Sequence, residues 1–169
     1  MVNNKKGITI AGNVLVDIVK NIDSYPKPGM LSYISDISYA VGGCVPNVAI
    51  DLAKIDPDVP VSAIGKLGSD ENGTYVLKQL QANGINTDMI CFSDKTPTSF
   101  SDVMSQPAGE RTFFHQKGTN AEFSPKDINI DSLECDILHI GYILLLDKFD
   151  EEDSEYGTAM ARFLHDVQK

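Results

Sequence analysis

The stretch YAVGGCVPNVAIDLAKI, residues 39–55, carries most of the information about the fold of this chain. Two adjacent glycines, Gly42 and Gly43, come directly before a helical pattern that contains Asn47. The start of a helix gathers unpaired N–H groups, which makes it a natural site for polar ligands. Glycines also serve plain structural turns. The rest of the sequence has to decide between a ligand site and a turn.

Three apolar runs on either side of this stretch are typical of buried strands. They are GITIAGNVLVDIV at 7–19, VSAIGKLG at 61–68 and CDILHIGYILLL at 135–146. The run at 7–19 begins with β-branched residues, as a buried strand does.

Helical patterns lie between and after these strands. The pattern at 47–55 places three apolar side chains on one face: Val48, Leu52 and Ile55. Asp70 can cap a helix at 71–82, which would turn Val76 and Leu80 inward and end at the NG pair, residues 83–84. A further apolar stripe has helical spacing: Tyr156, Met160, Phe163, Leu164 and Val167. Strands that alternate with helices predict a parallel α/β sheet.

Two segments depart from this alternation of strand and helix. Residues 30–41 alternate apolar and polar side chains, and so do residues 98–105, which a turn joins to a further strand ending near residue 116. Such alternation is typical of a sheet with one exposed face. We therefore expect a small antiparallel sheet, inserted into the α/β core near 17–41 and 98–116, that covers a site as a lid. An extension of the sheet edge without function would give the same pattern.

Asp17 follows the first predicted strand, in the segment GNVLVD at 12–17. The carboxyl ends of strands are where open α/β sheets bind ligands. A carboxylate there accepts two hydrogen bonds, which suits two neighbouring sugar hydroxyls. A vicinal diol between Asp17, the amides of Gly42 and Gly43, and the side chain of Asn47 would satisfy all of these groups. Taken singly, each of these residues also has a structural explanation as a turn or cap.

The composition narrows the classes of function. The chain has 169 residues, of which 42% are apolar and 22% charged, and these values are typical of one soluble globular domain. A net charge of −10 argues against nucleic acid as a partner. No apolar run approaches the length that spans a membrane, and residues 1–7 lack the apolar core of a signal peptide.

The cysteines and histidines indicate neither a disulfide framework nor a metal site. Three cysteines without metal-type spacing, Cys44, Cys91 and Cys135, favour a reducing cytoplasm. The three histidines are scattered through the sequence, and we expect them to be structural: His115, His139 and His165. We predict no metal site.

Five segments together resemble the ribokinase-like (PfkB-type) carbohydrate and nucleoside kinases, in order and in spacing. They are GNVLVD, AVGGCVPNVAIDLA, IGKLGSDENG, LQANGI and GTNAEFS, and the resemblance extends from Ile8 to about Leu146. It implies an α/β fold with three layers, α/β/α, a mainly parallel central sheet and a small antiparallel lid. It further implies ATP-dependent phosphorylation of a sugar hydroxyl. The residues that match substrate-binding positions of the family are Asp17, Gly42, Gly43 and Asn47, with Ser101 and Val103 in the lid.

Several positions depart from the family pattern. Many sugar kinases have a basic residue at the place of Cys44 and a glycine at that of Val45. Ribokinases have a polar amide at the place of Leu15 and an acid near Tyr142. These changes argue against ribose and favour a more apolar substrate, such as a nucleoside or a modified sugar. Tyr142 would then stack on a ring of the substrate, or simply fill space.

The chain stops at an amphipathic helix, where a parallel sheet would normally continue into another strand. We therefore expect residues 1–169 to be the N-terminal part of a longer kinase domain. The catalytic aspartate of the family lies in a glycine-rich turn near the C-terminus, so no catalytic residue is expected in this chain. By the same reasoning, the contacts to ATP and Mg²⁺ lie beyond Lys169. The resemblance also implies a homodimer formed through the lid.

Two other classes of function are alternatives to a kinase. A nicotinamide-binding domain would need G-x-G-x-x-G directly after the first strand, and GNVLVD does not supply it. A non-catalytic sugar-binding module remains an alternative if the gene ends at residue 169.

Overall fold

A parallel sheet of four strands forms the centre of the structure, a computed structural model that describes residues 6–169. The strand order is β5-β4-β1-β8, and every pairing is parallel. The strands are β1 (Ile8–Gly12), β4 (Val61–Gly68), β5 (Asn86–Ser93) and β8 (Ile137–Gly141). This confirms the predicted parallel α/β sheet.

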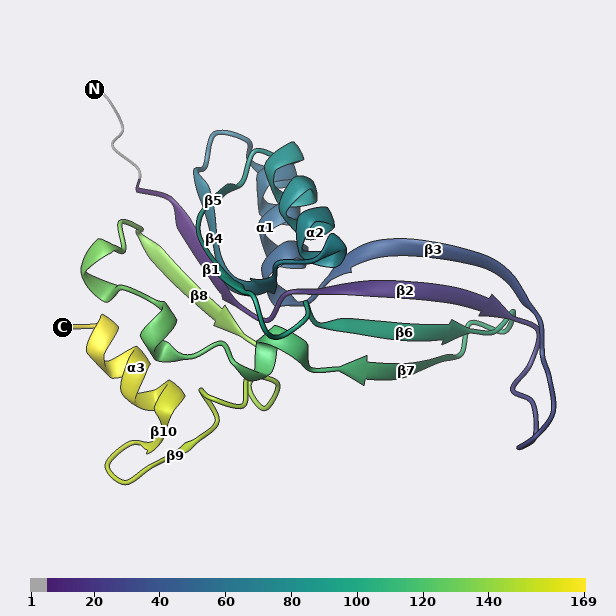
Figure 1. Cartoon of the computed structure of the whole chain (residues 1–169). Helices are drawn as coiled ribbons and strands as arrows, with labels where there is room; N and C mark the ends of the chain where they lie inside the picture. Colours follow the sequence, from purple (N-terminus) through teal and green to yellow (C-terminus); the bar gives the residue numbers. More distant parts are fainter. Residues whose placement is uncertain (1–5) are drawn as a thin grey trace.

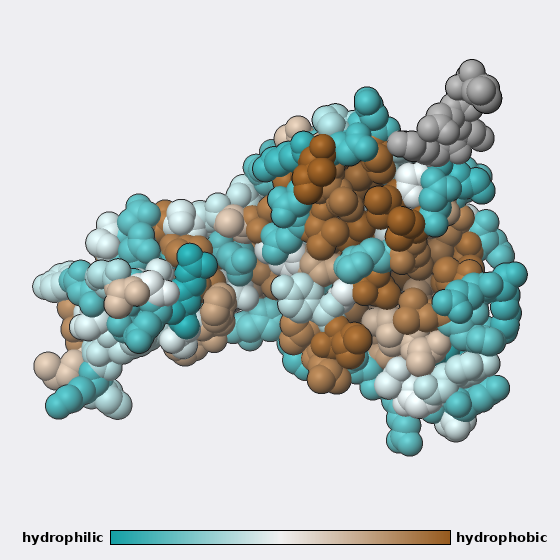
Figure 2. Space-filling view, turned by 180° about the vertical axis from the view of Figure 1, so that it is seen from behind, coloured by the Kyte–Doolittle hydropathy of each residue, from teal (hydrophilic) through white to brown (hydrophobic). Residues whose placement is uncertain are grey.

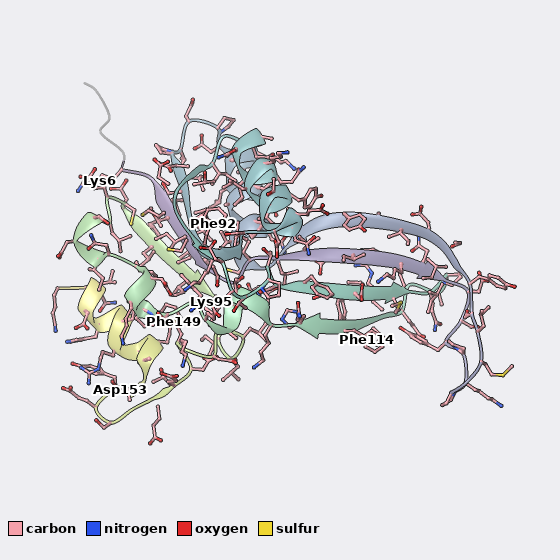
Figure 3. The ribbon with its side chains drawn as sticks, in the orientation of Figure 1. Lys6, Phe92, Lys95, Phe114, Phe149 and Asp153 are labelled. Carbon is pink, nitrogen blue, oxygen red and sulfur yellow. The ribbon has the colours of Figure 1, made fainter. Side chains whose placement is uncertain are left out.

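Helical elements cover both faces of this sheet and give the predicted three layers (Figure 1). Helices α1 (Cys44–Ile55) and α2 (Glu71–Ala82) pack on one face around Val45, Val76 and Leu80. The other face is covered by α3 (Ala159–Val167) and three short 3₁₀ turns: η1 (Gly118–Ala121), η2 (Pro125–Asp127) and η3 (Ile130–Ser132). On this side Phe149, which Figure 3 labels, lies on the sheet. Its ring centroid is 5.3 Å from that of Phe123 and 5.6 Å from that of Phe163.

A second sheet of four strands projects from one end of the α/β core (Figure 1). Its strand order is β3-β2-β6-β7, and its strands are β2 (Leu15–Ile22), β3 (Ile34–Gly42), β6 (Phe100–Ser105) and β7 (Arg111–Gln116). This is the small separate sheet that the alternating segments predicted, and we call it the lid. Its central pair, β2 and β6, is parallel rather than antiparallel, because both strands run outward from the core.

The junction between core and lid is held by a buried asparagine. Asn120 accepts a hydrogen bond from the amide of Val14 and donates one to its carbonyl, at 3.0 and 3.1 Å. Val14 belongs to the two-residue crossing from β1 to β2. Asn120 is fully buried, so this pairing satisfies polar groups that water cannot reach.

Helix α2 confirms its sequence prediction from end to end. Asp70 is its N-cap and accepts a hydrogen bond from the amide of Gly73 at 2.7 Å. At the other end Gly84 has φ +75°, and the amides of Gly84 and Ile85 bond to the carbonyls of Gln81 and Leu80. This is the Schellman arrangement expected of an NG terminus.

Two of the predicted strands are shorter than expected. The run at 7–19 divides into β1 and β2, which belong to different sheets, because the chain leaves the core after Gly12. The run at 135–146 is a strand only to Gly141, because Tyr142 and Leu144 adopt positive φ values of 64° and 72°.

Two of the predicted helical faces also differ from the structure. Helix α1 buries Cys44, Val45 and Ala49, and Ile55 at its last turn is 78% exposed. Tyr156 lies before α3 and not on its stripe, in the turn of a short hairpin formed by β9 (Glu152–Asp153) and β10 (Gly157–Thr158). The acidic segment 147–156 therefore contains the first strand of this hairpin, β9. No helix in residues 6–169 is long and apolar enough to cross a membrane.

Candidate functional site

A pocket of about 340 Å³ lies where the lid joins the core, next to the carboxyl ends of β1 and β8. Its lining comes from five segments that are far apart in the sequence. The lining residues are Asn13, Leu15, Asp17, Gly43, Asn47, Ser101, Phe113, His115, Tyr142 and Leu145. The volume is within the range of small-molecule sites.

The start of α1 forms one wall of this pocket. Gly43 is the N-cap with φ +91° and supplies no side chain, and Asn13 takes over the capping role from the β1–β2 crossing. The side-chain oxygen of Asn13 accepts from the amide of Cys44 at 2.7 Å, and its carbonyl accepts from that of Val45 at 3.2 Å. The amide of Asn47 bonds to the carbonyl of Gly43. These donors of the helix start are therefore already used within the protein.

This arrangement changes the expectation that the helix start offers free N–H groups to a ligand. Residue 46 is a proline and has no N–H. Within residues 6–169, no hydrogen bond is recorded for the amide of Gly43. The groups of this wall that stay available to a ligand are thus the Gly43 amide and the side chain of Asn47.

The lid contributes a row of three polar side chains. Asp17 in β2 is paired with Ser101 in β6, and Ser101 is paired with His115 in β7. Paired residues point to the same face of a sheet, so all three side chains face the pocket. The hydroxyl of Ser101 and Nδ1 of His115 are hydrogen-bonded at 3.0 Å.

Burial raises the pKa of the Asp17 carboxyl, and the nearby basic side chains of His115 and Arg111 offset part of this rise. Burial penalises the charged form because the carboxylate loses its hydration. Hydroxyl groups of a ligand that donate to Asp17 would replace this lost hydration. The site therefore favours a ligand with hydroxyl donors.

Gly42 acts through Asp17 and is not among the lining residues. A Cβ atom at position 42 would lie 2.7 Å from a methyl group of Leu15 and in severe overlap with the Asp17 carboxylate. Glycine at this position thus leaves room for the Asp17 side chain.

An apolar wall faces the polar groups. It is formed by Leu15, Phe113, Tyr142 and Leu145. The carboxylate of Asp150 accepts hydrogen bonds from the amides of Leu144 and Leu146, at 3.0 and 3.2 Å, in the turn that presents Tyr142 and Leu145. This turn contains both of the non-glycine residues with positive φ in the described part of the chain. Such strain persists only where surrounding contacts hold it in place.

The pocket brings together five of the seven substrate-binding residues predicted from sequence: Asp17, Gly43, Asn47, Ser101 and Tyr142. Gly42 and Val103 lie outside the lining, and Val103 is buried in the lid with 2% exposure. Sequence reasoning missed Asn13, Phe113, His115 and Leu145 as lining residues. The two-residue period of β7 would have placed Phe113 and His115 on the same face as Ser101, once the hairpin register was known.

The cysteines and the acidic groups do not form a metal centre in the part of the chain that the structure describes. No group of three or more potential ligands occurs within residues 6–169. Cys44, Cys91 and Cys135 are free thiols. Burial raises the pKa of Cys44 to about 11, so its thiol stays protonated at neutral pH.

Comparison with known proteins gives consistent matches over most of the chain. The family model described as "pfkB family carbohydrate kinase" matches residues 5–165. A probable fructokinase-5 from Arabidopsis thaliana is 28% identical over 138 residues, which are 80% of this chain and 41% of that protein. The chain spans about two fifths of the length of the curated relatives it matches.

Solved structures show the same fold. The crystal structure of a ribokinase from Thermotoga maritima has 25% identity and a TM-score of 0.71, over 78% of this chain and 43% of that one. A ribokinase from Arabidopsis thaliana, solved in complex with ribose and ATP, has 22% identity and a TM-score of 0.69, over 80% of this chain and 45% of that one.

Proposed function

The chain belongs to the pfkB family of carbohydrate kinases, and from this premise we propose that it forms the sugar-binding half of an ATP-dependent sugar kinase. The observation that carries this proposal is the pocket between lid and core, where Asp17, Asn47 and Ser101 converge. In this proposal Asp17 accepts hydrogen bonds from two sugar hydroxyls, and the Gly43 amide and Asn47 bind further oxygens of the sugar.

The residues of this pocket do not suit a magnesium nucleotide. Its ten lining residues include no lysine or arginine, and Asp17 is their sole carboxylate. Triphosphates are normally bound by cationic side chains or by glycine-rich turns, together with metal-binding carboxylates. We therefore propose that the catalytic aspartate and the contacts to ATP and Mg²⁺ belong to residues outside this chain.

The apolar wall supports a second candidate, a nucleoside kinase of the same fold. Leu15, Phe113 and Tyr142 offer a surface on which a nucleobase or an apolar substituent would pack. A non-catalytic sugar-binding module is the third reading. The two kinase candidates share the Asp17 contact and differ in what occupies the apolar wall.

Binding and turnover can be tested on the 169-residue chain. We expect D-fructose or D-ribose to raise its melting temperature and to give measurable heats of binding, with adenosine as the probe for the nucleoside alternative. With MgATP present, the sugar should be recovered unphosphorylated. Phosphorylation by the purified chain would contradict the proposed division of labour, and binding of none of the three probes would contradict the site itself.

We also propose that two copies associate through the outer face of the lid, in the cytoplasm. Tyr39 and Phe114 lie in one transverse row of that face and are 59% and 58% exposed. Figure 3 labels Phe114 on the lid. Light scattering of the chain and of a Phe114→Asp variant tests the dimer, which the variant should weaken. The three free thiols support a reducing compartment.

A further inference from the structure

His115 combines a place in the pocket with a fixed ring orientation. It lies on β7, two strands away from Asp17 in the same transverse row of the lid. Two strand spacings correspond to about 10 Å between the backbones at these positions. Asp17 and His115 thus lie at opposite edges of the polar row, with Ser101 between them.

The contact with Ser101 uses one of the two ring nitrogens. Nδ1 is bonded to the Ser101 hydroxyl at 3.0 Å, and Ser101 is 4% exposed. Within residues 6–169, this is the only hydrogen bond recorded for the His115 side chain. Nε2, on the other side of the imidazole, is therefore available to a ligand. In either tautomer it offers a donor or an acceptor, and a sugar hydroxyl can match both.

The surroundings of His115 favour a neutral hydroxyl over a charged ligand group. Asp17 faces the same pocket, and its carboxylate would repel an anionic substituent of a ligand. Arg111 lies on β7, two residues before Phe113. The ring of Phe113 stands between these two basic residues on the same face. A neutral polyol that extends from Asp17 to His115 would form hydrogen bonds with the side chains at both ends of the polar row.

We propose that His115 is a substrate-contacting residue that sets the selectivity of the pocket, through a hydrogen bond from Nε2 to the sugar hydroxyl farthest from Asp17. Ser101 then has the role of a positioning residue, because it fixes the ring from the adjacent strand. This inference rests on the proposed sugar-binding function. It adds a hydrogen bond from His115 to the side of the sugar farthest from Asp17.

Two substitutions separate this role from a structural one. The amide of asparagine takes the place of Nδ1, so His115→Asn keeps the bond to Ser101 and loses the ligand contact. The longer glutamine side chain brings its amide to the place of Nε2, so His115→Gln keeps the ligand contact. The affinities of the purified chain for D-fructose and D-ribose are measured by calorimetry, together with the ligand-free melting temperature. Gln116→Ala, on the opposite face of β7, is the matched control.

We expect His115→Asn to lower the affinity for the better-bound sugar about three- to tenfold, because one hydrogen bond to the sugar is lost. Its melting temperature without ligand should stay close to that of the wild type. His115→Gln should retain most of the affinity, and the ratio of the affinities for the two sugars should change in His115→Asn alone.

The failures of the two proposals differ. Unchanged affinities in His115→Asn, with normal binding by the wild type, would overturn the role of His115 alone. If His115→Asn and His115→Gln lowered the sugar affinity equally and also lowered the melting temperature, the role of His115 would be structural. This result would also overturn the inference. No binding of either sugar by the wild type would overturn the proposed sugar site itself.

Discussion

The neighbouring glycines at positions 42 and 43 are required for different physical reasons. Gly43 has φ +91°, and a Cβ atom there would lie 2.6 Å from the carbonyl oxygen of Asn13. Both the backbone and the contact with Asn13, which caps α1, oppose a side chain. We expect Gly43→Ala to lower stability by about 1–3 kcal/mol. In a domain of this size that lowers the melting temperature by roughly 5 °C, which calorimetry can measure.

Gly42→Ala serves as the matched variant for this prediction. The φ value of Gly42 is not positive, and the clash of an added Cβ is with the carboxylate end of a side chain, Asp17, and with Leu15. Asp17 can move aside, so stability should change little while sugar affinity falls. If Gly42→Ala lowered the melting temperature as much as Gly43→Ala and left affinity unchanged, the link between Gly42 and Asp17 would be wrong.

Asp17 gives a prediction in which stability and binding move in opposite directions. Its pKa is raised by burial, so the folded state holds this proton more tightly than the unfolded state does. Stability is therefore lost as the pH rises from the unfolded to the folded pKa. Asp17→Asn removes this loss, and its ligand-free melting temperature at pH 7 should equal or exceed that of the wild type. Sugar affinity should fall roughly ten- to a hundredfold, because a bond to a charged acceptor is lost.

Melting curves between pH 3 and 8 and calorimetric titrations check this prediction. The difference in melting temperature between Asp17→Asn and wild type should shrink toward low pH, where Asp17 is protonated in both states. A lower melting temperature at pH 7 combined with unchanged sugar affinity would identify Asp17 as a structural residue.

Individual site residues were predictable where backbone and side chain act in one short motif. The segment around Gly43 and Asn47 can be recognised in the sequence, because two glycines stand directly before a helical pattern. Asn13 and His115 carried no such signal, because their roles depend on contacts across 31 and 14 residues of sequence. No local pattern showed that Asn13 would take up the amides of the helix start, which reduces the donors left for a ligand.

At the scale of elements, α2 is tied to the lid by the residue that caps it. The carboxylate of Asp70 accepts from the amide and the hydroxyl of Thr98, at 2.8 and 2.7 Å, as well as from Gly73. Thr98 is fully buried and lies two residues before β6. Burial alone would raise the pKa of Asp70, but these hydrogen bonds outweigh it and the pKa is lowered. Asp70 therefore stabilises the fold above its unfolded pKa, and this contribution is lost as the pH falls through the folded value.

We expect Asp70→Ala to lower the free energy of unfolding by about 1–2 kcal/mol, which is the usual effect of removing a helix cap. The loss of the hydrogen bonds to Thr98 should lower it further. Chemical denaturation at pH 7 measures this cost, and Glu71→Gln in the same helical turn is the control. The difference between Asp70→Ala and the wild type should narrow below pH 4. If the difference in the free energy of unfolding stayed constant down to pH 3, the charge of Asp70 would not be the cause of its stabilising effect.

Elements with strong local signals were predicted well, and those defined by a change of direction were not. Helix α2 has a cap, an apolar stripe and an NG terminus, and all three were read correctly. The apolar run at 135–146 is continuous in sequence, so its end at Gly141 depends on positive φ values at Tyr142 and Leu144 that hydropathy does not encode. The division of 7–19 into two strands likewise depends on Asn120, about one hundred residues away.

At the scale of the whole molecule, apolar side chains are concentrated on the surface of the α/β body. Figure 2 shows a broad hydrophobic area over this body, whereas the lid end is largely hydrophilic in the same view. Among the described residues, strand β8 pairs with β1 on one side only, and Ile137 within it is 56% exposed. In the turn that follows, Ile143 and Leu144 are 72% and 76% exposed. An unpaired strand edge beside apolar side chains is a template for association.

We therefore expect the purified 169-residue chain to self-associate and to bind a hydrophobic dye. Leu144→Asn tests the cause, because it removes one exposed apolar side chain and also suits the φ of +72°, which asparagine tolerates better than leucine. It should raise the melting temperature and reduce both dye binding and the apparent mass in light scattering. Ile143→Asn is the matched control, since it removes a similar exposed side chain at a position without positive φ. It should reduce association without raising the melting temperature. A monomeric wild-type chain with a sharp melting transition and no dye binding would show that this surface is stable in water without a covering partner.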